Sequence, residues 1–346
     1  MGFERNSQGR ILSNLINKSV RFYTSDANLN INPWFICGFT DGEGCFSVSI
    51  IENKEFKTGK RVLPSFQITL HKKDKPLLEQ IQSYPLFGVG KIYKQGSELI
   101  QFRVQSLKDL KVVIDYFDKF PLITEKWADY FLFKQILNLM LEKEHRTLEG
   151  LYRIIAIKAS INRGLTDKLK FTFSSVTRVV RPSVINIKIP DPNWLAGFTS
   201  AEGSFMVQVK TSGQVQLVFR LGQHSRDEQL MESLIYYLHC GSLYKQKEAV
   251  IFEVKKLSDI NEKIIPFFKK YPILGVKSKN FESPPPPLPG IPLFPFPLST
   301  ERGKGSGGRG GDLRGPTGDP PPELVWSCRY YETQETSDSW RIRSNS

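Results

Sequence analysis

The chain has 346 residues and a formal net charge of +13, with 40% hydrophobic and 24% charged residues. This composition excludes a collagen-like or wholly disordered chain, and no apolar run approaches the ~20 residues of a membrane-spanning helix. Basic and acidic residues are equal in number from Ser283 onward, so the whole positive excess lies in residues 1–282 and favours a polyanionic partner such as nucleic acid.

The first elements can be placed from start signals and alternation. Residues 1–31 are interpreted as a leader or exon-derived segment, with a weak likeness to a mitochondrial transit peptide. A helix is expected from Pro33 to about Glu43, because proline is favoured at a helix start and Asn32 suits the N-cap. An alternating strand follows, with Phe46, Val48 and Ile50 on one face. The next elements are expected to be a strand near 65–71, a helix over 75–83, a hairpin near 90–104, a helix near 107–117 and an amphipathic stretch over 127–142.

The second half repeats the first. WFICGFTDGEGCFSVSI from Trp34 matches WLAGFTSAEGSFMVQV from Trp194, and a later block from Gly90 matches one from Gly241. YFDKFPLITEK and FFKKYPILGVK then match in the same order. Three matched blocks indicate one duplicated unit. Helices alternating with paired strands make each copy an α+β unit with an antiparallel sheet that buries one face.

The repeat sets the expected domain boundaries. The first unit is placed at 32–163, a linker at 164–190 and the second unit at 191–282. Only SKNFES follows Lys277 before a proline run, so the last helix of the second unit is predicted to be missing. The Pro/Gly-rich tail at 283–346 is predicted to be disordered.

The repeated motifs ICGFTDGEG and LAGFTSAEG carry the chemistry. Glycine costs about 1 kcal/mol inside a helix, so its repetition there indicates close approach of two helices. Packing of the two helices would bring Glu43 and Glu202 together at their C-terminal ends. Two adjacent carboxylates repel, and a divalent cation such as Mg²⁺ relieves the conflict. A metal-activated water attacking a phosphodiester is the chemistry that suits this arrangement.

The two motifs resemble the LAGLIDADG signature of homing endonucleases, in the single-chain, two-motif form common in fungal mitochondrial introns. The resemblance implies two pseudo-symmetric αββαββα units forming a saddle of two antiparallel sheets, in a mitochondrial protein that acts as a monomer. It implies metal binding by Glu43 and Glu202 and by the backbone carbonyls of Gly42 and Ala201. Asp41 matches the motif's other acid, but Ser200 stands at that place in the second copy, so the metal site does not require an acid there.

Further roles follow from the same resemblance. Lys126 and Lys277 match the family's basic residue near each scissile phosphate, where each would stabilise developing charge. Gln223 is expected to help order the catalytic water, although its counterpart is Leu70. His71 and His224 align with each other and are interpreted as structural or DNA-facing.

Polar residues on the strands and their loops are expected to contact DNA, since alternate side chains of a ribbon can enter the major groove. The candidates in the first half are Ser47, Ser49, Lys54, Lys57, Lys60, Arg61, Gln67, Lys94, Gln95, Gln101 and Arg103. Those in the second half are Gln208, Lys210, Gln216, Arg220, Lys245, Gln246 and Lys247. Because the halves differ at many of these positions, the target is expected to be long and non-palindromic.

Three functions stay open at this point. The first is a site-specific double-strand DNA endonuclease that promotes intron mobility. The second is a maturase that binds intron RNA. The third is a decayed DNA-binding protein without cleavage activity. The retained Glu43 and Glu202 favour the first, whereas the predicted loss of the last helix favours the third.

Overall fold

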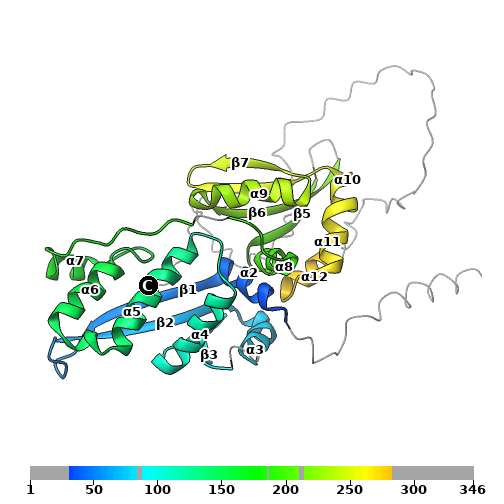
Figure 1. Cartoon of the computed structure of the whole chain (residues 1–346). Coiled ribbons are helices and arrows are strands. Elements are labelled where there is room, and N and C mark those ends of the chain that lie inside the picture. The colour runs from blue at the N-terminus through cyan, green and yellow to red at the C-terminus, as the bar shows by residue number, and fades with distance from the viewer. Residues whose placement is uncertain (1–30, 84–87, 185–186, 210–213, 283–346) are drawn as a thin grey trace, which may run out of the picture.

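The computed structural model describes residues 31–83, 88–184, 187–209 and 214–282. The predicted leader, apart from Ile31, and the predicted tail lie outside the described residues. Two units of the same architecture follow each other along the chain (Figure 1). The described residues contain no helix that is both long and apolar enough to cross a membrane.

The first unit contains four strands and the helices that cover them. Its elements are α2 (Pro33–Glu43), β1 (Gly44–Glu52), β2 (Lys60–His71), the 3₁₀ turn η1 (Lys72–Asp74), α3 (Lys75–Ser83), β3 (Lys91–Gln95), β4 (Leu99–Val104), α4 (Leu107–Lys119) and α5 (Lys126–Leu141). The turn η2 (Glu144–Arg146) and helices α6 (Leu148–Lys158) and α7 (Asp167–Thr172) complete its length. Sequence patterning had not placed α6, and α7 lies inside the segment that was predicted to be a linker.

The second unit repeats this order. Its elements are α8 (Pro192–Glu202), β5 (Gly203–Val209), β6 (Val215–His224), the turn η3 (Ser225–Asp227), α9 (Glu228–Leu238), β7 (Ser242–Gln246), β8 (Ala249–Val254), α10 (Leu257–Asp259), η4 (Ile260–Ile264), α11 (Ile265–Lys270) and α12 (Val276–Glu282). The sheets have the orders β1-β2-β4-β3 and β5-β6-β8-β7, and every pairing is antiparallel. The predicted pair of αββαββα units with two antiparallel sheets is confirmed.

Local sequence explains where the two central helices begin. The Asn32 side chain accepts a hydrogen bond from the Trp34 amide at 2.8 Å, and Pro33 follows it. In α8, Asp191 accepts from the Asn193 amide at 2.7 Å and Pro192 opens the helix. Such caps satisfy amides that have no partner within a helix.

One face of each sheet packs on helices and forms the core. In the first unit Phe46 and Phe66 lie under α4 and α5, with Phe46 in contact with the Phe117 and Phe133 rings. In Figure 1 α4 and α5 lie in front of β1 and β2. The other sheet face, opposite these helices, carries the polar half of the alternation and is left for a partner.

The prediction that the second unit lacks its last helix was wrong in part. The helix α12 is present over seven residues, Val276–Glu282. Phe281 anchors it, because its ring lies 5.3 Å from the Phe205 ring and 6.0 Å from the Phe268 ring, centroid to centroid. The helix therefore packs on β5 as α5 packs on β1, over 7 described residues against the 16 of α5.

We expect Phe281→Ala to lower the free energy of unfolding by about 2 kcal/mol, since it removes a partly buried ring from an aromatic cluster. Chemical denaturation of the full chain would measure this. Phe171→Ala is the matched control, because Phe171 is 88% exposed. Equal stability of the two variants would show that α12 is not packed on the sheet.

Candidate active site

The centre of the molecule is the contact between α2 and α8, which lie side by side between the two sheets (Figure 1). A Cβ atom added at Gly38 would lie 1.8 Å from the Trp194 carbonyl oxygen. One added at Gly197 would lie 2.0 Å from the Phe35 carbonyl oxygen. The two glycines therefore let the helix backbones touch, as the repeated motifs predicted.

This contact brings the C-terminal ends of the helices together. A Cβ at Gly42 would lie 2.2 Å from the Ala201 Cβ and 3.2 Å from the Glu202 Cγ. Burial, and next the charge of Glu202, raise the pKa of Glu43 to about 7, while Lys277 and Lys126 oppose the rise. Helix C-termini add further negative potential at this point. The site is thus a pair of acids that favours a cation.

Glu43→Gln is expected to stabilise the metal-free protein more at pH 8 than at pH 5. The folded protein holds the Glu43 proton more tightly than the unfolded chain, because the pKa rises from 4.5 to about 7. The free energy of unfolding therefore falls as the pH rises through this window, and glutamine removes that loss. Thermal melts in EDTA at both pH values would measure the gap between wild type and variant. A gap that stays constant with pH would contradict the prediction.

The two predicted lysines lie beside the acids. The Lys126 Nζ donates to the Gly42 carbonyl at 2.8 Å and to the Gly44 carbonyl at 2.5 Å. The Lys277 Nζ donates to the Ala201 carbonyl. Each ammonium group thus donates a hydrogen bond to the carbonyl that the resemblance assigned to the metal. It also supplies positive charge beside the carboxylates.

Asp41 has a different role from the motif glutamates. It is 1% exposed and accepts hydrogen bonds from the Ile123 amide at 3.1 Å and from the Thr124 hydroxyl at 2.6 Å. It also accepts from the Trp194 indole at 2.8 Å. Asp41 therefore holds the loop before Lys126 and ties α8 to it. This agrees with the inference that the metal site does not need an acid at this motif position.

The second unit holds its lysine loop at the same position with a hydroxyl. The Ser200 Oγ accepts from the Leu274 amide at 3.1 Å and donates to the Ala196 carbonyl at 2.8 Å. A neutral serine can take the place of the aspartate because it accepts a hydrogen bond from one backbone amide, whereas Asp41 accepts from several donors.

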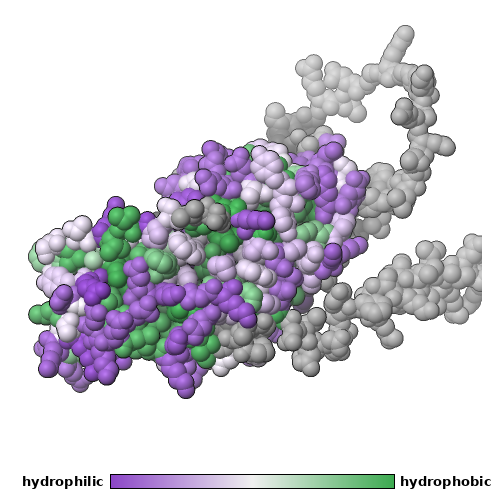
Figure 2. All heavy atoms as spheres, viewed as in Figure 1, coloured by the Kyte–Doolittle hydropathy of each residue, from purple (hydrophilic) through white to green (hydrophobic). Residues whose placement is uncertain are grey.

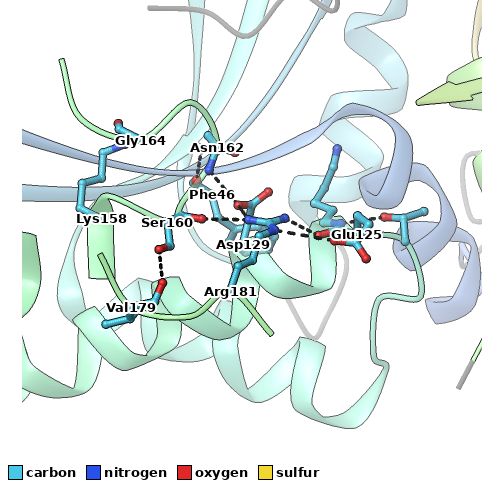
Figure 3. A network of polar contacts seen from close by, with 11 residues as sticks. Phe46, Glu125, Asp129, Lys158, Ser160, Asn162, Gly164, Val179 and Arg181 are labelled. Carbon is cyan, nitrogen blue, oxygen red and sulfur yellow. Dashed lines mark hydrogen bonds and ion pairs between the residues drawn. The ribbon is translucent and has the colours of Figure 1, made fainter. Parts of the chain in front are cut away.

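Arg181, from the segment predicted to be a linker, joins this site (Figure 3). Its guanidinium donates to the Asp129 carboxylate at 2.5 Å and to the Glu125 carbonyl at 2.8 Å. Asp129 in turn accepts from the Asn162 amide at 2.8 Å, and Asn162 donates to the Phe46 carbonyl. The network fixes the residue directly before Lys126 to β1, α5 and the chain between the units.

The polar face of the first sheet gathers most of the predicted contact residues. By strand register its outward positions hold Ser47, Ser49, Arg61, Gln67, Gln95, Gln101 and Arg103. Lys54 and Lys57 are exposed in the β1–β2 connection, and Lys60 pairs with Glu52 at 3.4 Å. Gln101 differs from its prediction, since it is 2% exposed and bonded to Thr69 and Arg103. It supports Arg103 and does not present its amide at the surface.

The outward face of the second sheet holds fewer of the predicted contact residues. Its outward positions hold Gln208, Gln216, Arg220 and Gln246. Arg220 is paired with the buried Glu253 carboxylate, and Lys247 lies in the β7–β8 turn with a φ of 52°. Lys210 lies outside the described residues.

Two predicted contact lysines lie on the wrong face. Lys94 pairs with Ile100 and Lys245 with Val250, which places both on the helix-covered side. Lys245 is also held by Glu228 of α9 at 2.6 Å. The outward neighbours are the half-exposed Tyr93 and Tyr244, which strict alternation along β3 and β7 would have found.

Gln223 is also misplaced by the prediction. It shares the core face with Phe219 and Leu221, and its side chain accepts from the His224 amide at 3.0 Å. Among the predicted contact residues, the outward ones paired with the start of the first strand of each sheet are instead Gln67, opposite Cys45, and Arg220, opposite Ser204. Both had been expected only to contact DNA.

The helix-covered side of the molecule suits DNA less well. Figure 2 shows hydrophobic residues between hydrophilic ones on this side, and the exposed ones on α5 and α6 are Phe131, Leu141, Leu148 and Tyr152. Apolar side chains do not bind phosphate groups, whose contacts come from basic and hydrogen-bonding residues. The outward sheet faces are the better candidates for a nucleic-acid interface.

The sequence pattern of the LAGLIDADG endonucleases matches residues 36–137 and 195–283, the parts that hold both acids and both lysines. The chain belongs to the LAGLIDADG endonuclease family. Probable intron-encoded endonuclease 3 of Neurospora crassa is 39% identical over 303 residues, covering 81% of this chain and 56% of that protein. Probable intron-encoded endonuclease 2 of the same organism is 38% identical, covering 79% and 63%. The chain thus spans 56–63% of the length of these two relatives.

Solved LAGLIDADG structures share the fold. I-SmaMI bound to an uncleaved DNA target in the presence of calcium ions matches with a TM-score of 0.71 at 44% identity, over 72% of this chain and 88% of that chain. The LAGLIDADG homing endonuclease I-GzeII in complex with a DNA target matches with a TM-score of 0.69 at 44% identity, over 73% and 88%. At this identity the likeness extends to sequence as well as fold.

Proposed function

We propose that this protein is a site-specific DNA endonuclease of the homing type. It hydrolyses one phosphodiester in each strand of a long, non-palindromic target and so promotes intron mobility. The observation that carries the proposal is the pairing of Glu43 and Glu202 at the helix crossing, each unit adding one lysine beside them. Two pseudo-equivalent sites suit two antiparallel strands.

The donor set at the helix ends fits Mg²⁺. Glu43 and Glu202 supply hard carboxylate oxygens, and Gly42 and Ala201 supply carbonyl oxygens. Within the described residues no group of three or more His, Cys, Asp or Glu side chains is arranged to hold a metal ion. Water and phosphate oxygens would complete the coordination of a Mg²⁺ ion held by the two glutamates. A metal held by these residues would supply an activated water and charge stabilisation at the leaving oxygen.

The chain's own residues orient the reaction. The carboxylates of Glu43 and Glu202 would hold the cation at the point where the units meet. Lys126 and Lys277 exchange their carbonyl partners for phosphate oxygens and stabilise the charge that develops there. The outward sheet faces bind the duplex, with Arg103 and Arg61 of the first sheet as cationic contacts.

The relatives support the remaining parts of the proposal. The solved relatives named above were bound to DNA targets, and one of them in the presence of calcium ions. Mitochondrial location is proposed because the fungal relatives include the mitochondrial protein RF1 of Saccharomyces cerevisiae, 25% identical over 60% of this chain. The presence of both acids in one chain supports the proposal that the protein acts as a monomer.

The decisive experiment uses purified full-length protein and DNA spanning the intronless insertion site of the host gene. Cleavage at one position with Mg²⁺ and none with EDTA is expected. Binding without cleavage would overturn the endonuclease and favour the decayed DNA-binding protein, or the maturase if intron RNA binds more tightly. Affinity is expected to fall steeply with salt through counterion release, and a flat dependence would remove the polyanion interface.

A further inference from the structure

Two aspartates reach across the contact between the units. The Asp227 Oδ1 of the second unit accepts a hydrogen bond from the Glu125 amide of the first unit at 2.7 Å. The Asp74 Oδ1 of the first unit accepts from the Val276 amide of the second unit at 2.7 Å. The two contacts are equivalents in the repeat, since each aspartate ends the 3₁₀ turn after the second strand of its unit.

Each contact ends directly beside a catalytic-site lysine. Glu125 precedes Lys126 at the start of α5, and Val276 precedes Lys277 at the start of α12. Glu125 makes no side-chain cap of its own, so the aspartate supplies the acceptor that the first amides of a helix lack. The lysine ammonium groups then reach back to Gly42 and Ala201.

The surroundings are built for these contacts. Gly275 has a φ of +78°, and a Cβ there would lie 2.6 Å from the Asp74 Oδ1. The turns that carry the aspartates are capped by histidines, since the His71 and His224 Nδ1 atoms accept from the Lys73 and Arg226 amides at 3.1 Å. These caps give both histidines a structural role, and the strand register also places both at outward positions of their sheets.

We propose that Asp74 and Asp227 are positioning residues, each of which holds the lysine of the opposite unit in place for cleavage. The inference rests on the proposed endonuclease function and deepens it. Each site then depends on the other unit for its geometry. A displacement of about 1 Å at a reacting group can cost on the order of a hundredfold in rate, so this anchoring matters for catalysis.

Substitution of each aspartate by asparagine or by alanine separates the effect of its hydrogen bond from the effect of side-chain packing. Asparagine keeps an oxygen that accepts from the amide, whereas alanine removes it. Burial raises the pKa of Asp227 to about 7, and the bond from the Glu125 amide opposes this rise, so a neutral acceptor suits the position. We expect D227N and D74N to behave like wild type in both tests below.

The first test measures hydrogen–deuterium exchange of the full chain without DNA. D227A is expected to speed exchange about tenfold in peptides covering 121–127 and to leave those covering 272–279 unchanged. D74A is expected to do the reverse. Matched controls are E228A and E79A, whose side chains pair only with lysines in the contacts described. Unchanged exchange in both segments, or equal acceleration in both, would overturn the proposal.

The second test measures nicking of a supercoiled plasmid that carries the target, with strand-specific labels. K126M and K277M define which strand each lysine serves. D227A is expected to slow nicking of the strand that K126M leaves uncut by about ten- to a hundredfold. D74A is expected to slow nicking of the strand that K277M leaves uncut by the same factor. The proposal would be overturned if each variant slowed nicking of the strand that depends on the lysine of its own unit. Equal slowing of nicking on both strands would also overturn it. If wild type cleaves nothing, the proposed function fails, while the exchange test still decides the anchoring.

Discussion

Glu43→Gln is expected to abolish double-strand cleavage, with a loss of at least about a thousandfold in rate, and Glu202→Gln is expected to do the same. Glutamine keeps the shape of the side chain but cannot supply a carboxylate to the proposed cation site between α2 and α8. Because both acids lie at one helix crossing, either change is expected to disturb cation binding for the cleavage of both DNA strands. The appearance of linear product from a supercoiled target plasmid with Mg²⁺ measures this.

DNA binding should survive both changes, because the sheet faces that are proposed to contact the duplex are untouched. A gel-shift titration in calcium would show an affinity within about threefold of wild type. Glu79→Gln serves as the matched control, since this carboxylate is exposed and pairs with Lys75 on α3. Cleavage by either motif variant at the wild-type rate would remove the metal site from these residues.

Gly38→Ala is expected to be the most damaging small substitution in the fold. The new methyl group would lie 1.8 Å from the Trp194 carbonyl oxygen, so the two central helices must separate. We expect a loss of about 3 kcal/mol or more in the free energy of unfolding, and a fall of roughly 6–12 °C in Tm. Differential scanning calorimetry measures both quantities.

Gly222→Ala is the control for this substitution, since a Cβ at Gly222 would meet no atom within 4 Å. Its Tm should stay within about 2 °C of wild type. Gly197→Ala should resemble Gly38→Ala, because its Cβ would lie 2.0 Å from the Phe35 carbonyl oxygen. A stable Gly38→Ala protein would show that the helices do not touch here.

The duplicated motif made the centre of the fold predictable. Backbone contact between helices demands glycine, so Gly38 and Gly197 leave a sequence signal, and the acids follow at a fixed spacing. Strand faces were harder to predict, because a shift of one residue moves a side chain to the other side of the sheet. Gln223, Lys94 and Lys245 were misplaced in this way.

The contacts between units could not be predicted. Asp74 and Asp227 meet backbone amides, which any residue offers, so the sequence carries no mark of these partners. Helix α12 was missed because only a short run of residues separates Lys277 from the prolines. The matched blocks of the two halves end at this lysine, so the repeat gave no sign of a helix beyond it.

Arg181 gives the chain between the units a part in the site. A segment that joins two duplicated domains is ordinarily treated as a tether whose length alone matters. Here it lies in neither copy of the repeat, yet its guanidinium holds the Glu125 carbonyl directly before Lys126. Dividing the protein into two separate polypeptides at this segment is therefore expected to disturb the surroundings of Lys126, even if both halves folded and reassembled.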